Sequence, residues 1–436
     1  MPKIITDVVC PYCGCLCDDL EVIVEDNKIV ETRSNCELGT KRFLDSDIST
    51  RLKIPMIRVN GEFKEVPMDE AVQRAAEILA KAKRPLSYGW SSTECDAIKV
   101  GVELAEELGA VFDDTTSVCH GPTTLALQEV GISTCTLGDV KNRADLVIYW
   151  GCNPMQAHPR HLSRYTTFPR GFFRERGQEN RTLVVVDVRK TDTAKLANHF
   201  LQVKPNYDYE LISAFRLAIK GYKVPDFVGG VPREKIEEIA GIMKRSQFIA
   251  IFFGLGVTMS GAKNRTVDNI LSLTRDLHKF TKCVIMPMRG HYNVTGFNEV
   301  STWETGFPYA VDFSRGYPRY NPGETSTIEV LLRGEVDAAL IVASDPIAHF
   351  PKEATKHLMS IPIVAIDSHE SLTTEVASVV IPAAIAGIEV DGTAYRMDHV
   401  PIRLRKILEP PQGVLPDREI LSRILENVRK LKGEAQ

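Results

Sequence analysis

The stretch DLVIYWGCNP, residues 145–154, joins a run of apolar residues directly to a polar turn that contains glycine and proline. Such a stretch is typical of a β-strand in a parallel sheet that ends at a ligand-binding loop. The same pattern recurs in PLSYGW (85–90), TLVVVDVRK (182–190), FIAIFFGLG (248–256), CVIMPMRG (283–290), DAALIVASDP (337–346), PIVAIDSHES (362–371) and SVVIPA (378–383). Helical apolar spacing separates these strands, as in residues 68–82 and 264–280. The alternation predicts parallel α/β layering with ligands at the carboxyl edges of the sheets.

The bulk composition is that of a multidomain globular protein. The chain has 436 residues and 44% hydrophobic content, which predicts two or three domains. Its 53 basic and 57 acidic residues are interspersed and give a net charge of −4, so we expect no nucleic-acid partner. The start, MPKIITDVVC, lacks the pattern of a secretory leader, and no run of eighteen apolar residues occurs. We therefore expect a cytoplasmic protein without membrane insertion.

Four cysteines crowd into VVCPYCGCLCDDL, residues 8–20. In a reducing cytoplasm such cysteines favour metal binding over disulfides. The spacing of Cys10, Cys13 and Cys17, with Cys36 after eighteen intervening residues at the end of a predicted hairpin, indicates a [4Fe–4S] cluster. A structural zinc site and plain buried cysteines are the alternatives, and Cys15 is an alternative cluster ligand.

The domain boundaries carry no low-complexity linker. A hairpin signal with an Asn60-Gly61 turn closes a small β-rich module. We predict a cluster module at 1–55, a discontinuous α/β domain at 56–115 and 325–436, and a second α/β domain at 116–324.

A cysteine and a histidine adjoin in DDTTSVCHGPTT, residues 113–124. Cys119 lies between a short apolar strand and the glycine-proline start of a helix. A thiolate near a helix N-terminus is favoured by the helix dipole and can ligate a metal or attack an electrophile. Burial as a small hydrophobic residue is the alternative interpretation.

The cluster module, SVCHGPT (117–123), WGCNPMQAHP (150–159), VVVDVRKTDTA (184–194) and FFGLG (252–256) occur in one order. Together they resemble the molybdopterin oxidoreductase superfamily, which includes formate dehydrogenases. The closer resemblance, over essentially the whole chain, is to the family of tungsten- or molybdenum-containing subunits of archaeal formylmethanofuran dehydrogenases. It implies a fold like domains I–III of formate dehydrogenase and DMSO reductase: the iron–sulfur module and then two doubly wound α/β domains.

The resemblance also implies tungsten or molybdenum held by two molybdopterin guanine dinucleotides and by a protein thiolate. Cys119 matches that metal ligand, His120 matches the active-site histidine, and Arg289 in MPMRGHYNVTG (286–296) matches the substrate-orienting arginine. A guanidinium binds a carboxylate bidentately, and an imidazole moves protons near neutral pH. The alternatives are that His120 satisfies a backbone carbonyl and that Arg289 neutralises phosphates.

The strand-end loops then become candidates for the two dinucleotides, through backbone N–H groups, carboxylates facing guanine and close approach at glycine. One set is Gly151, Asn153, Pro154, Asp187, Arg189, Gly254 and Gly256; the other is Ser344, Asp345, Pro346 and Asp367. Each aspartate has an alternative role as a helix cap or turn residue.

Two features depart from the superfamily pattern. Formate dehydrogenases place a lysine two residues after the fourth cluster cysteine, but Leu38 stands there, and Lys41 is the nearest substitute for an electron relay. The chain also ends without the C-terminal β-barrel domain, so we expect a small β-barrel subunit to complete the cofactor cradle.

The function implied by the resemblance is reversible reduction of CO2 to formate, with electrons from the cluster. Formate would then pass to an amidohydrolase-like, metal-dependent subunit for condensation with methanofuran, the first step of methanogenesis from CO2, and polyferredoxin-like subunits would deliver electrons. The rival functions are a non-redox scaffold, as in the formyltransferase/hydrolase complex of methylotrophic bacteria, and a formate dehydrogenase acting on free formate.

Overall fold

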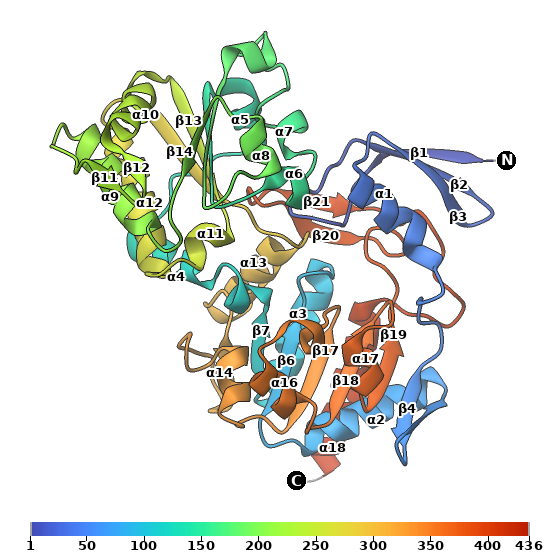
Figure 1. Ribbon diagram of the computed structural model, residues 1–436. Helices are drawn as coiled ribbons and strands as arrows, with labels where there is room; N and C mark the ends of the chain where they lie inside the picture. Colours follow the sequence, from blue (N-terminus) through green and yellow to red (C-terminus); the bar gives the residue numbers. More distant parts are fainter. Residues whose placement is uncertain (1, 435–436) are drawn as a thin grey trace. The chain divides into compact units, whose positions relative to one another are not determined.

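The computed structural model describes residues 2–434, which form two compact units (Figure 1). The first unit comprises residues 2–118, 291–396 and 401–434, and the second comprises 119–290 and 397–400. The second unit therefore ends near residue 290, not at the expected 324. The reason is long-range packing, since α13 (Val294–Thr305) packs on α3 (Cys95–Leu108) and β15 (Val311–Asp312) pairs with β7 (Val111–Asp114).

A small antiparallel sheet opens the first unit. Its strands are β1 (Lys3–Val8), β2 (Leu20–Glu25) and β3 (Lys28–Arg33), followed by α1 (Glu37–Leu44). The predicted β2–β3 hairpin is confirmed, and α1 packs on β3. The cysteine-rich loop thus lies between β1 and β2, while Cys36 is the N-cap residue of α1.

A nine-stranded sheet is the main layer of the first unit, in the order β16-β15-β7-β6-β17-β18-β19-β4-β5. The parallel centre consists of β6 (Pro85–Gly89), β7, β17 (Ala338–Val342), β18 (Ile363–Asp367) and β19 (Val379–Pro382). Antiparallel edges are added by β15 with β16 (Arg319–Tyr320) and by β4 (Met56–Val59) with β5 (Glu62–Glu65). Because Asn60 and Gly61 both have positive φ, 52° and 91°, they form the tight turn that the sequence predicts.

Helices cover both faces of this sheet because alternate residues of its strands point to opposite sides. Leu340 and Val342 pack with α2 (Met68–Lys81), α3, α13 and α18 (Asp417–Glu434), whereas Ala339 and Ile341 pack with α14 (Thr327–Leu332) and α16 (Lys352–Leu358). The shorter elements of this unit are α15 (Pro346–His349), α17 (Leu372–Val376), β20 (Gly392–Tyr395) and β21 (Pro401–Leu404).

The second unit contains a five-stranded, fully parallel sheet in the order β10-β9-β8-β13-β14. The strands are β8 (Leu146–Trp150), β9 (Thr182–Asp187), β10 (His199–Gln202), β13 (Phe248–Phe253) and β14 (Lys282–Pro287). The longer helices are α4 (Gly121–Val130), α9 (Asp208–Ile219), α10 (Arg233–Arg245) and α12 (Asn264–Leu277). Shorter elements are α5 (Leu137–Arg143), α6 (Pro154–Ala157), α7 (His161–Arg164), α8 (Asp192–Lys195), α11 (Leu255–Thr258), β11 (Phe227–Val228) and β12 (Val231–Pro232).

Each parallel sheet has a point where the winding direction reverses. In the second unit it lies between β8 and β13, and in the first between β6 and β17. The crevice beyond the carboxyl ends of such strands is where open α/β sheets bind ligands. The loops after these strands are therefore the first places to look for a site. Within residues 2–434, no helix combines the length and apolar character needed to cross a membrane.

Candidate active site and cofactor-binding loops

Cys119 lies where the sequence predicts, two residues before α4 and after the 3-10 turn η2 (Thr115–Val118) that follows β7. The residue is half-buried, and its backbone carbonyl accepts a hydrogen bond of 3.0 Å from Thr258 Oγ1 at the end of α11. Pro122 in the first turn of α4 suits a helix start, because a proline there removes no helical hydrogen bond. The thiol is therefore presented at a fixed helix N-terminus, where the helix dipole favours a thiolate.

His120 is fully buried and bonded through both ring nitrogens. Nδ1 lies 3.0 Å from Thr123 Oγ1, and Nε2 lies 3.3 Å from the carbonyl oxygen of Met288. Because a carbonyl oxygen only accepts, Nε2 carries the hydrogen and Nδ1 accepts from the threonine hydroxyl. Burial, together with the Arg289 charge, lowers the pKa of His120 to about 3, so the ring is neutral near pH 7.

Arg289 is buried at 4% exposure in the segment that leaves β14. The segment is tied down by Met288, whose N–H donates to Phe253 O at 2.8 Å. His120 also bonds Met288 O, and the Arg289 charge acts on the His120 ring. The second unit thus brings Arg289 and the Cys119-His120 pair into one neighbourhood.

The cysteine loop is equally compact within the first unit. Cys10 N donates to Cys17 O at 2.8 Å, and Cys36 Sγ accepts from Gly39 N at 3.3 Å. Burial raises the pKa of Cys10 well above its usual range, and the nearby Cys13, Cys17 and Cys36 add to that rise. Buried thiols packed together in this way suit a multinuclear cation such as [4Fe–4S], which stabilises thiolates.

Burial of Cys10, Cys13, Cys15 and Cys17 fits both a cluster and plain buried cysteines. Cys15 hydrogen-bonds Cys13, and this bond and burial raise the pKa of Cys15 while the same bond lowers that of Cys13. Cys15 is thus a thiol partner of Cys13, while Cys10, Cys13, Cys17 and Cys36 retain the predicted ligand spacing. No three described His, Cys, Asp or Glu side chains are arranged for a single metal ion. The cluster assignment rests on spacing and on mutual proximity.

Lys41, the relay residue predicted from the sequence, lies on α1. Lys41 is exposed, whereas the next residue, Arg42, is half-buried. Burial raises the pKa of Tyr12 in the cysteine loop and of Asp367 at the end of β18, and the Arg42 charge opposes both rises in part. Side-chain direction on a short helix was not readable from the sequence, so Arg42 was missed.

Gly151, Gly254 and Gly256 lie where the loops after β8 and β13 come into close contact. A Cβ on Gly151 would lie 2.7 Å from Gly256 Cα, and one on Gly254 would lie 2.7 Å from Cys152 Cβ. Gly256 N donates to Gly151 O at 2.9 Å, and Gly151 has a φ of +59°. These glycines therefore let the loops after β8 and β13 meet backbone to backbone at the reversal point.

Asn153 and Asp345 occupy matching places after β8 and β17. Asn153 Oδ1 accepts from Thr193 Oγ1 at 2.7 Å, and Asp345 Oδ1 accepts from Thr373 Oγ1 at 2.6 Å. Each side chain thus ties its loop to the helix after the next strand. Asn153 Nδ2 is buried with no hydrogen-bond partner among the described residues, which leaves a donor for a bound acceptor. Neither threonine was singled out in the sequence, although each lies six residues after the aspartate that ends the preceding strand.

Asp187 and Asp367 end the next strand in each unit. Asp187 Oδ1 accepts from Arg189 N at 3.4 Å, and Asp367 Oδ1 accepts from Ser368 N at 2.6 Å. Burial raises the pKa of Asp187, and it raises that of Asp367 to about 6. Desolvated carboxylates at these strand ends fit the role of receiving N–H donors from a base.

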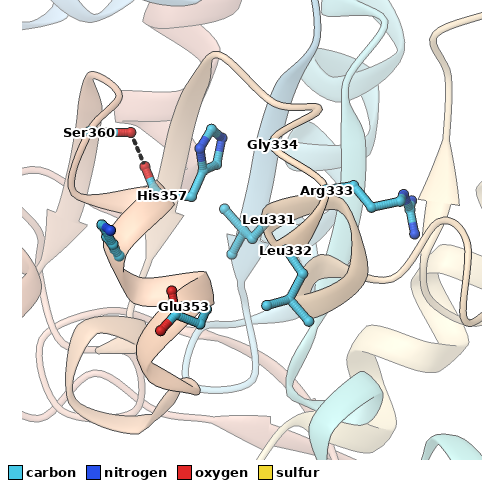
Figure 2. Close-up of a pocket in the computed structure, with 8 residues that line it drawn as sticks. Leu331, Leu332, Arg333, Gly334, Glu353, His357 and Ser360 are labelled. Atoms are coloured by element: carbon cyan, nitrogen blue, oxygen red, sulfur yellow. Dashed lines mark hydrogen bonds between the residues drawn. The ribbon is translucent and has the colours of Figure 1, made fainter.

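The remaining predicted residues lie in the same loops. Ser344 is half-buried, Pro154 and Pro346 are buried at the starts of α6 and α15, and the side chain of Arg189 is exposed. A separate cavity of about 390 Å³ lies between α14 and α16 in the first unit (Figure 2). Leu331, Glu353 and His357 line it, and none of the predicted site residues does.

Comparison with known proteins places this chain in a family. The model of the family "Molybdopterin oxidoreductase" matches residues 51–427. The corresponding subunits of tungsten-containing formylmethanofuran dehydrogenase 2 from Methanocaldococcus jannaschii and Methanococcus maripaludis are 56% and 53% identical to this chain. Both alignments cover 99% of this chain and 100% of the relative. The alpha subunit of F420-dependent formate dehydrogenase 2 from M. maripaludis is 26% identical over 97% of this chain and 70% of its own.

Solved structures share the fold at low identity. A chain of the formyltransferase/hydrolase complex FhcABCD from Methylorubrum extorquens aligns with a TM-score of 0.71 at 22% identity, over 87% of this chain and 99% of its own. Acetylene hydratase from Pelobacter acetylenicus aligns with a TM-score of 0.75 at 14% identity, over 98% of this chain and 69% of its own. The α/β architecture is therefore shared with both.

Proposed function

We propose that this chain is the redox subunit of a formylmethanofuran dehydrogenase. The chain belongs to the molybdopterin oxidoreductase family and, within it, to the formylmethanofuran dehydrogenase subunits. The proposed reaction is reversible reduction of CO2 to formate. The observation that carries this proposal is the neighbourhood of Cys119, His120 and Arg289. Three residues separated by up to 170 positions meet there as a thiol, a neutral imidazole and a buried guanidinium.

A molybdopterin-bound tungsten or molybdenum centre supplies two-electron chemistry when it is bound, and Cys119 is its proposed protein ligand. Arg289 would bind the carboxylate of formate bidentately and fix the direction of its C–H bond. A guanidinium desolvated at 4% exposure binds a carboxylate more strongly than one in water. The protein contributes orientation and charge at the reacting carbon.

His120 restricts where a proton can go. Its Nε2–H is directed to Met288 O, so Nδ1, which accepts from Thr123, is the ring nitrogen open to a proton, and the pKa of about 3 means that it would hold that proton only transiently near pH 7. Through the same bond His120 holds the segment that presents Arg289. We assign it both tasks.

The cofactor's two dinucleotide arms would bind to matching loops. Gly151, Asn153, Pro154, Asp187, Arg189, Gly254 and Gly256 would serve one arm, and Ser344, Asp345, Pro346 and Asp367 the other. The unpartnered Asn153 Nδ2 and the desolvated Asp187 and Asp367 support this assignment. In the loops after β8 and β13 the glycines would act indirectly, by letting the two loops meet.

Electrons would arrive through a [4Fe–4S] cluster on Cys10, Cys13, Cys17 and Cys36. Arg42, rather than the exposed Lys41, is the cation whose charge reaches both the cysteine loop and Asp367. The partners that we propose are a β-barrel pterin-binding subunit, an amidohydrolase-like subunit that condenses formate with methanofuran, and polyferredoxin-like subunits. The relatives are named as single subunits of a larger enzyme, which supports partner subunits here.

One alternative function has specific support. The 26% identity to a formate dehydrogenase alpha subunit over 97% of this chain favours oxidation of free formate by the same site. The two functions share Cys119, His120 and Arg289. They differ in whether formate leaves to solvent, so formylmethanofuran turnover by the purified complex separates them.

The test of the redox site is Cys119→Ala in the native complex, with formate oxidation followed by an artificial dye. We expect the activity to be lost because the thiolate ligand is gone. Cys135→Ala is the matched control, since Cys135 is also half-buried in the second unit and its Sγ donates to Thr136 O. Full activity in the Cys119 variant would rule out an essential ligand role.

A further inference from the structure

The segment after β14 is held by three hydrogen bonds from three different elements. Met288 N donates to Phe253 O on β13 at 2.8 Å, and His120 Nε2 bonds Met288 O at 3.3 Å. His158 Nε2 bonds the next carbonyl, that of Arg289, at 2.8 Å. Two imidazoles therefore donate to consecutive carbonyl oxygens, and the second holds the backbone of Arg289 itself.

His158 is built into its own loop as firmly. It is the C-cap residue of α6, its N–H donates to Pro154 O at 2.8 Å, and its carbonyl accepts from His161 N at 2.8 Å. The side chain is buried at 2% exposure, and burial lowers the pKa of His158 to about 4, so the ring is neutral near pH 7. A neutral ring has one N–H, and the Arg289 carbonyl fixes it on Nε2.

The bond to Arg289 is the one side-chain hydrogen bond that His158 makes within the described chain. The other nitrogen, Nδ1, is buried with no partner among the described residues. Replacement of His158 by an apolar residue would therefore leave the Arg289 carbonyl without this donor.

We propose that His158 is a positioning residue that fixes the direction in which Arg289 presents its guanidinium to formate. The inference rests on the proposed function, in which Arg289 binds the carboxylate. It adds a link between two parts of the site, because α6 begins at Pro154 in the loop proposed for one dinucleotide. The same short helix thus serves the dinucleotide loop at its start and the substrate arginine at its end.

The chain offers a matched control for a histidine that bonds a backbone carbonyl. His357 Nε2 lies 2.8 Å from Val336 O in the first unit, the same contact length as His158 to Arg289. Figure 2 shows His357 at the cavity between α14 and α16, in a region that contains none of the proposed site residues. His357→Leu therefore shows what the loss of a histidine-to-carbonyl hydrogen bond does when the bond lies away from the proposed site.

The experiment compares His158→Leu, His158→Gln and His357→Leu in the native complex, with formate oxidation by a dye measured as KM and kcat separately. Loss of one positioning hydrogen bond is expected to raise the KM for formate about tenfold in His158→Leu. Glutamine keeps an N–H donor of similar reach, so His158→Gln should recover most of the affinity. His357→Leu should leave the KM unchanged, and tungsten or molybdenum content per chain should match the wild type in all three.

A double-mutant cycle with Arg289→Ala separates this inference from the function on which it rests. If His158 acts through Arg289, His158→Leu should add no further loss in the Arg289→Ala background. An unchanged KM in His158→Leu with full metal content would overturn the positioning role. An unchanged KM in Arg289→Ala would instead overturn the proposed role of Arg289.

A second pair of variants covers the case in which His158→Leu fails to assemble. His158→Asn places its amide short of the Arg289 carbonyl, whereas His158→Gln reaches it. A higher KM for the asparagine variant than for the glutamine variant supports the positioning role, and equal KM values would contradict it.

Discussion

A single hydrogen atom in place of a side chain at Gly151 lets the loop after β8 meet the loop after β13. The residue combines a φ of +59° with a neighbour, Gly256 Cα, that lies 2.7 Å from where a Cβ would stand. We expect Gly151→Ala to lower the free energy of unfolding by about 1–3 kcal/mol through overpacking and backbone strain. Thermal unfolding of this variant and of the wild type measures the loss of stability.

Gly221 is the matched control for that substitution. It also has a positive φ, of +80°, but nothing lies within 4 Å of its Cβ position. Gly221→Ala should therefore report the backbone strain alone. Equal melting temperatures for the two variants would show that an added Cβ at residue 151 causes no steric clash between the loops after β8 and β13.

Asp417, the first residue of α18, predicts a pH dependence. Burial raises the pKa of its carboxyl to about 7 from the ordinary value of 3.8, against the hydrogen bond from Thr93. The folded chain therefore binds a proton that the unfolded chain releases, and stability falls as the pH rises from about 4 to about 7. For one proton the slope approaches about 1.4 kcal/mol per pH unit.

Asp417→Asn removes that proton exchange and should flatten the dependence of melting temperature on pH between these limits. Asp69→Asn, at an exposed site paired with Arg423, should leave the dependence as in the wild type. An unchanged slope in Asp417→Asn would mean that the carboxyl ionises normally in the fold.

At the scale of elements, the segment between α7 and β9 is an irregular connection fixed by one arginine. Arg181 is buried at 6% exposure and donates to the carbonyls of Ala144, Thr167, Pro169 and Lys141. Desolvation lowers its pKa to about 10, yet the side chain remains charged near pH 7. The Arg181 guanidinium thus supplies hydrogen-bond donors to backbone carbonyls that no regular helix or strand pairing satisfies.

Arg181→Leu should lower the free energy of unfolding by about 2–4 kcal/mol because several buried carbonyls lose their donor. The nearby exposed Arg176 provides the control, and Arg176→Leu should stay within about 0.5 kcal/mol of the wild type. Denaturant unfolding of both variants measures the difference. Similar losses in the two would contradict the assignment.

The elements were largely predictable, but the domain division and some side chains were not. All eight strand stretches, such as 145–154, form strands because apolar runs with polar ends are a local signal. The boundary near 290 depends on α13 meeting α3, a contact between residues nearly two hundred positions apart. In the candidate site, Cys119 lies at the helix start that its motif predicts, whereas the hydrogen bond from His158 to the Arg289 carbonyl joins residues 131 positions apart and was not readable from the sequence.

At the scale of the molecule, two sheets present equivalent loops at their reversal points. Asn153 with Thr193 and Asp345 with Thr373 make the same contact in the two units, and Asp187 and Asp367 end the next strand in each. The repetition predicts two nucleotide arms per chain. Acid release of guanosine monophosphate from the native complex should give about two per tungsten or molybdenum atom. A value of one would leave one set of loops without its proposed ligand.

The most direct test of the redox assignment is metal analysis of the anaerobically isolated native complex by mass spectrometry. We predict about one tungsten or molybdenum atom per copy of this chain and at least about four iron atoms. Iron without either heavy metal would contradict the proposed active site and leave an electron-transfer subunit. Absence of all three metals from intact complex would contradict the redox function and favour a non-redox scaffold.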